Sequence, residues 1–259
     1  MDSSRNIINF MGVNVDVVDT KGLYNRIIDF AQNNKPHKVM YVNAYCMLIA
    51  QKDDEYREIL NSADLVYADG ISIVWGARFL GNCLPCRSTG ADFIPGFCQV
   101  FAEKGFKIYL LGARPGVAEV AGQKLKQANP TLKIAGAHYG YFSHHENQRI
   151  IDEINRATPH ILLVGMGVPY QEKWIDKNFS LLNVPVVWSV GGLFDFLSGN
   201  LKRGPQWLLD NGFEWLCRLC VEPRRLWKRY LIGNLLFIWY VFHWKFSIKK
   251  GKRIARGDT

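Results

Sequence analysis

Between residues 36 and 200 the chain alternates short apolar runs with amphipathic stretches, and this alternation limits the fold most strongly. The runs are rich in β-branched residues and several end in Gly, Asn or Asp, which is typical of buried strands. The stretches between them have apolar residues at helical spacing. This alternation of strands and helices predicts an α/β fold with a Rossmann-like, mostly parallel sheet flanked by helices. The predicted strands are 38–42, 65–68, 107–111, 133–137, 161–165 and 184–190, with a short strand or hairpin at the sheet edge within 8–19.

The carboxyl ends of these strands form the expected binding edge, because parallel α/β sheets bind ligands there. The segment LLGARPGVAEVAG (110–122) is either a phosphate-binding loop with its helix N-terminus or an ordinary strand–helix turn. No GxGxxG motif follows a predicted strand, so a Rossmann oxidoreductase is disfavoured. The candidate binding residues at this edge are Asn43, Asp69, Gly112, Gly167, Gly191 and Gly192.

Asp69 is the candidate catalytic group of this edge, because it directly follows an apolar strand. A carboxylate there is well placed for general-base catalysis. The alternative is that it caps the next helix at its N-terminus. Arg87 and Gln171 also lie in predicted loops, as either site residues or surface polar residues.

We predict no metal site. No Asp-x-Asp occurs, so a diphosphate would be held by arginines and backbone N–H groups. Cys83-x-x-Cys86 and Cys217-x-x-Cys220 suggest a zinc site only superficially, because the second pair lies in an apolar helical run. No secretory signal precedes the first strand, so we expect a cytoplasmic, reduced setting without disulfides.

The positive charge of the chain is concentrated at its C-terminal end. The whole chain has 32 Lys and Arg against 23 Asp and Glu, a net charge of +9. Residues 201–259 have 13 Lys and Arg against 4 Asp and Glu, so they carry the whole excess of +9. This division predicts a catalytic body (1–200), a helical basic and aromatic appendage (201–246, with helices near 205–220 and 223–246) and a disordered tail (247–259).

The appendage has three possible roles: contact with an anionic membrane, packing on the body, or nucleic-acid binding. The uncharged run LIGNLLFIWYVF (231–242) would be about 18 Å long as a helix, too short for a bilayer core of about 30 Å. Such an apolar run beside cationic residues favours a lipid surface over nucleic acid. Sequence alone does not decide between insertion into lipid and packing on the body.

Several segments together resemble the WecG/TagA/CpsF family of bacterial glycosyltransferases (glycosyltransferase family 26). The resemblance covers residues from about 40 to about 230, in order. It is carried by ADG (68–70), R-x-TG (87–90), IYLLGARPGVAE (108–119), HYGYF (138–142), G-x-P-x-QE (167–172), VGG-x-FD-x-x-x-G (190–199), EWLCRL (214–219) and EPRR (222–225).

The resemblance implies an inverting enzyme that moves a sugar from a UDP-sugar to a saccharide on polyprenyl diphosphate, for exopolysaccharide, capsule or cell-wall polymers. It implies no metal cofactor, peripheral attachment to the inner face of the plasma membrane, and a possible homo-oligomer. Asp69 matches the general base and Asn43 a polar residue beside it. Residues matching groups that contact substrate or its phosphates are Arg87, Gln171, Arg218, Arg224 and Arg225.

Two positions depart from the family pattern. Tyr41 stands where a Thr is frequent, and Cys217 stands where an aromatic residue is frequent. The first could alter sugar specificity, and the second is expected to affect packing. The alternative to an enzyme is a non-catalytic α/β module that binds a membrane surface or nucleic acid. It leaves Asp69, Arg87 and Gln171 unexplained as a set.

Overall fold

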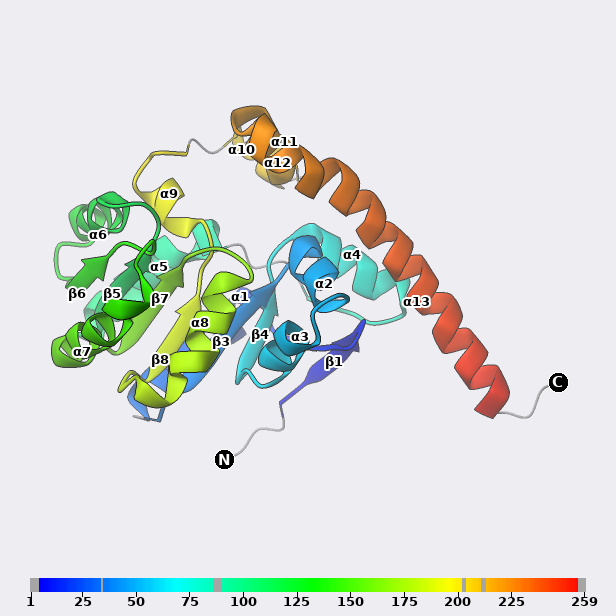
Figure 1. Cartoon of the computed structure of the whole chain (residues 1–259), viewed down its shortest axis with the longest axis horizontal. Coiled ribbons are helices and arrows are strands. Elements are labelled where there is room, and N and C mark those ends of the chain that lie inside the picture. The colour runs from blue at the N-terminus through cyan, green and yellow to red at the C-terminus, as the bar shows by residue number, and fades with distance from the viewer. Residues whose placement is uncertain (1–4, 34, 86–89, 202–203, 211–212, 256–259) are drawn as a thin grey trace.

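A parallel six-stranded sheet forms the centre of the computed structural model, which describes residues 5–33, 35–85, 90–201, 204–210 and 213–255 (Figure 1). The strand order is β4-β3-β8-β7-β5-β6, and each adjacent pair is parallel. The expected α/β fold and all its predicted strands are therefore confirmed. The strands are β3 (His37–Val42), β4 (Leu65–Ala68), β5 (Lys107–Gly112), β6 (Lys133–His138), β7 (Ile161–Gly165) and β8 (Val186–Ser189).

Helices flank the sheet and bury their apolar sides against it. In α7 the residues Ile150, Ile151 and Ile154 are buried, as the helical spacing of the sequence predicts. On another part of the sheet the Phe97 ring packs at 5.4 Å from the Trp188 ring of β8. The helices of this body are α1 (Thr20–Gln32), α2 (Ala44–Ala50), α3 (Asp54–Asn61), α4 (Ile71–Phe79), α5 (Gly90–Glu103), α6 (Val117–Ala128), α7 (Asn147–Ala157), α8 (Tyr170–Asn178) and α9 (Leu193–Leu197).

The predicted N-terminal hairpin is present, as β1 (Ile7–Phe10) paired antiparallel with β2 (Val13–Asp16). It forms a separate two-stranded sheet next to β4. Asp16 joins the two sheets, because its buried carboxylate accepts from the Val66 backbone N–H at 2.7 Å. The guanidinium groups of Arg5 and Arg26 compensate its charge at 2.8 and 2.6 Å.

The C-terminal part is helical, as expected, but its segments differ from the prediction. The helix expected at 205–220 is two helices, α10 (Gln206–Asp210) and α11 (Glu214–Val221). Phe213 is the N-cap of α11, so the second of these helices has its own beginning. The second helical stretch comprises α12 (Pro223–Trp227), a π-helical turn (Lys228–Ile232) and α13 (Gly233–Ala255). It continues past residue 247, where we expected a disordered tail, and no proline interrupts it.

The long helix α13 packs on the body with one face (Figure 1). Phe237 and Val241 are buried, and Lys245 Nζ donates to the Phe79 carbonyl oxygen at 2.7 Å. The other side exposes apolar side chains, among them Trp239 at 57% and Phe246 at 60%. Segment 231–246 thus packs on the body and also presents apolar surface outward. Within the described residues, no helix combines the length and apolar character needed to cross a bilayer.

Candidate active site

Glycines at the carboxyl ends of three neighbouring strands lie close together. Gly165 and Gly191 form the floor of the site, whereas Gly112, a predicted binding residue, does not line its cavity. Gly112 ends β5, Gly165 ends β7, and Gly191 follows β8. A Cβ on Gly112 would collide with the Gly165 backbone, and a Cβ on Gly165 would lie 2.8 Å from the Gly191 carbonyl oxygen. Side chains are therefore excluded here, and the three strand ends approach one another closely.

Gln171 holds two of the loops above this floor. Its Oε1 accepts from the Gly167 N–H at 3.2 Å and from the Gly191 N–H at 3.0 Å. Its Nε2 donates to Glu172 Oε1 at 2.7 Å, and both side chains are fully buried. Burial raises the pKa of the Glu172 carboxyl to about 7. Gln171, predicted to contact substrate, lies beneath the glycine loops and fixes their positions.

A pocket of about 320 Å³ opens above the glycine loops, and we call it the polar pocket. It lies at the carboxyl edge of the sheet, as the sequence predicted. Residues of the C-terminal helices contribute to its lining. Its walls include Tyr41, Asn43, Asp69, Tyr141, Gly167, Gly191, Gly192, Asp195, Glu214, Arg218, Arg225 and Arg229.

Asn43 and Asp69 follow the adjacent strands β3 and β4. Asn43 is the N-cap of α2, and its Oδ1 accepts from the N–H groups of Tyr45 and Cys46 at 3.0 and 3.1 Å. The Asp69 N–H donates to the Val42 carbonyl oxygen at 2.8 Å. The N-cap position of α4 is taken by Gly70, with φ +120°, one residue after Asp69.

Three arginines of the C-terminal helices reach the polar pocket, namely Arg218, Arg225 and Arg229. Within the described residues, the Nε atoms of Arg218 and Arg229 are buried and have no hydrogen-bond partner. Buried donors of charged groups ordinarily find an acceptor, which makes them candidates for a bound anion. Arg224 is exposed and lines neither this pocket nor the groove described below. Arg87 lies outside the described residues.

Several pocket residues were not predicted from the sequence, among them Arg229 and Asp195. Arg229 lies four residues after Arg225 in one helical stretch, a spacing that places both on one face. Asp195 is part of the VGG-x-FD motif, which was noted without a role for its carboxylate. Burial raises the pKa of the Asp195 carboxyl, and the charge of Arg225 opposes this increase.

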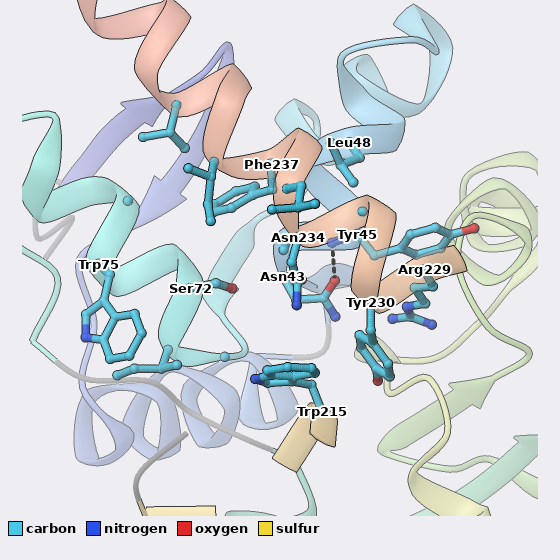
Figure 2. A pocket seen from close by; sticks show the side chains of 18 of the residues that line it. Asn43, Tyr45, Leu48, Ser72, Trp75, Trp215, Arg229, Tyr230, Asn234 and Phe237 are labelled. Carbon is cyan, nitrogen blue, oxygen red and sulfur yellow. Dashed lines mark hydrogen bonds between the residues drawn. The ribbon is translucent and has the colours of Figure 1, made fainter. Parts of the chain in front are cut away.

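A second cavity of about 710 Å³ adjoins the polar pocket, and we call it the apolar groove. Figure 2 shows Trp75 of α4, Trp215 of α11 and Phe237 of α13 around it, with Asn43 and Arg229 at its inner end. Residues that line both cavities are Asn43, Asp69, Glu214, Arg218 and Arg229. Asp69 therefore faces a polar cavity and an apolar one.

Across the described part of the chain, no three His, Cys, Asp or Glu side chains are grouped so that they could hold a metal ion. Cys217 is half-buried in α11, and Cys83 is exposed, while Cys86 lies outside the described residues. Metal independence of the reaction stays a prediction.

Comparison with known proteins agrees with this geometry. The sequence profile of the family described as "Glycosyl transferase WecG/TagA/CpsF family" matches residues 8–251. The chain is similar to the N-acetylglucosaminyldiphosphoundecaprenol N-acetyl-beta-D-mannosaminyltransferase of Bacillus subtilis strain 168, at 35% identity over 73% of each chain. It is similar to the protein of that name in Staphylococcus aureus strain NCTC 8325, at 28% identity over 95% of this chain and 96% of the relative. The chain therefore belongs to the WecG/TagA/CpsF family of glycosyl transferases.

Proposed function

We propose that this chain is an inverting glycosyltransferase that moves a sugar from a UDP-sugar to a saccharide carried on polyprenyl diphosphate. The names of its relatives support an acceptor of this class, since they act on a saccharide linked to diphosphoundecaprenol. The observation that carries the proposal is the position of Asp69, which lines both the polar pocket and the apolar groove.

The polar pocket is suited to the UDP-sugar donor. Its glycine loops let a ligand approach the backbone closely, and its arginines can pair with phosphate oxygens. Arg218 and Arg229 bring buried Nε donors to this pocket. As the bond between sugar and diphosphate breaks, negative charge grows on the leaving UDP, and Arg218 and Arg225 of this pocket would stabilise it.

Asp69 would act as the general base. In the proposed single displacement, an acceptor hydroxyl attacks the anomeric carbon of the donor from the side opposite the diphosphate. The Asp69 carboxylate takes the hydroxyl proton, the new glycosidic bond forms, and the bond to UDP breaks. One displacement inverts the anomeric centre. No metal ion is required, because the arginines supply the positive charge.

The exposed face of α13 would attach the protein to the inner surface of the plasma membrane, where a polyprenyl-linked acceptor is anchored. Trp239 and Phe246 are exposed on this helix, and the basic excess lies in the same part of the chain. Aromatic residues combined with cations favour an anionic lipid surface. Replacing both Trp239 and Phe246 with Glu should reduce the fraction of the protein that sediments with anionic vesicles at least about tenfold. Glu at Tyr170 and Leu181, which are exposed on the body, serves as the control.

The activity is tested by incubating the full chain with a panel of UDP-sugars and a bacterial polyprenyl-lipid extract, and measuring UDP release with and without EDTA. We expect lipid-dependent release from one donor, unaffected by EDTA. Arg229→Ala should lower the rate at least about tenfold, since a buried charged donor is lost. Arg224→Ala, which removes an arginine of the same helical stretch outside both cavities, should not. The proposal is refuted if no donor is turned over and UDP does not bind.

A further inference from the structure

The apolar groove has walls from two helices that are far apart in the sequence. Trp75 and Phe79 contribute from α4, and Ile238 and Phe242 contribute from α13. The rings of Phe79 and Phe242 lie 4.7 Å apart between centroids, so the two helices are in contact along this wall. The buried ring of Phe237 lies deeper and also packs against Phe10 of the hairpin. The groove is thus a built feature of the fold, held open between packed helices (Figure 2).

The groove ends at charged groups. Asp69, Arg218 and Arg229 line it at the end that adjoins the polar pocket, whereas its remaining walls are predominantly apolar. A matching ligand has an anionic group beside an apolar chain. A prenyl diphosphate has this arrangement, because its diphosphate is directly bonded to the first isoprene unit.

We propose that the groove binds the isoprene units next to the diphosphate of the acceptor lipid, between α4 and α13. This inference rests on the function proposed above and adds the subsite that recognises the lipid. With the chain in the groove, the diphosphate lies near Arg229, and the saccharide that it carries lies near Asp69. A volume of about 710 Å³ is in the range of small-ligand cavities, so it takes only the first units of a long chain.

The groove also explains why Trp75, at 58% exposed, and Ile238, at 50%, are apolar although water reaches them. Covering such side chains with isoprene units removes apolar surface from water and so favours binding. Recognition of the lipid would therefore add to the affinity for the diphosphate and orient the acceptor hydroxyl toward the donor.

The test measures binding of farnesyl diphosphate and of inorganic diphosphate to the full chain by isothermal titration calorimetry, without membranes and below the micelle concentration. We expect farnesyl diphosphate to bind at least about tenfold more tightly, which is about 1.4 kcal/mol. Ile238→Asp should remove most of this difference. Trp239→Asp is the matched control, since Trp239 is the neighbouring residue, is similarly exposed, and does not line the groove.

Two results would overturn the inference. One is equal affinity for the two ligands, and the other is equal weakening of farnesyl diphosphate binding by Ile238→Asp and Trp239→Asp. Turnover of a UDP-sugar on the lipid extract is measured in parallel. Turnover without a preference for the prenyl chain rejects the groove and keeps the proposed function. A prenyl preference that is lost only in Ile238→Asp, with neither turnover of any donor nor binding of UDP, keeps the groove and rejects the function.

Discussion

Replacing Glu172 with Gln should stabilise the protein at neutral and alkaline pH. The carboxyl is fully buried beneath the glycine loops, and burial raises its pKa from 4.5 to about 7. A difference of about 2.5 in pKa corresponds to about 3 kcal/mol at about 1.36 kcal/mol per unit. The folded state holds the Glu172 proton more tightly than the unfolded state, so the contribution of this group to stability is greatest below about pH 4.5 and falls until about pH 7. Gln has no such proton to lose and can still accept from Gln171.

The assay is urea unfolding of both proteins between pH 5 and pH 8. The measured quantity is the difference in unfolding free energy between Glu172→Gln and the unchanged protein. This difference should rise with pH by about 3 kcal/mol in total and level off above pH 7. Glu58→Gln, at an exposed position of α3, should show no comparable rise. A difference that stays constant across this pH range would refute the assignment of a protonated, buried Glu172.

Three further changes test the local geometry. Gly191→Ala should lower the free energy of unfolding by about 1–3 kcal/mol, because φ of Gly191 is +58° and the new Cβ would lie 2.5 Å from the Tyr41 hydroxyl. Adding Tyr41→Phe to this variant should recover part of the loss, as measured by thermal unfolding. Gln171→Ala should raise the KM for the donor at least about tenfold in initial-rate kinetics, because two loop N–H groups lose their acceptor; an unchanged KM would contradict this role. Asp16→Ala should lower the free energy of unfolding by about 3–5 kcal/mol in urea unfolding, because the two paired guanidinium groups lose their buried partner.

The strands could be predicted from the sequence because most of them are short, strongly apolar runs bounded by helical spacing, whereas β6 is a half-exposed edge strand with a weaker pattern. Parallel strands buried on both faces leave such a continuous signal. The strand order could not be predicted in this way, since the pairing of β3 with β8 joins segments far apart in the chain. The binding edge followed from the glycines and polar residues at the strand ends.

The role of Gln171 and the apolar groove could not be predicted from local sequence. Gln171 was expected to contact substrate, and only the structure places its Oε1 between two loop N–H groups. The groove forms because α13 packs against α4. These helices are far apart in the chain, and the apolar periodicity of each helix does not predict that they are in contact. Arg229 belongs to the site for the same reason, because the C-terminal helices pack over the sheet edge.

The most direct test of the proposed mechanism is the turnover number of Asp69→Asn with the donor and lipid that support UDP release. Asp54→Asn, at an exposed position of α3, is the control. Loss of a positioned general base predicts a decrease in kcat of about 10²–10⁴, with UDP binding unchanged. A kcat for Asp69→Asn within about threefold of the control would contradict the proposal that Asp69 takes the proton from the acceptor.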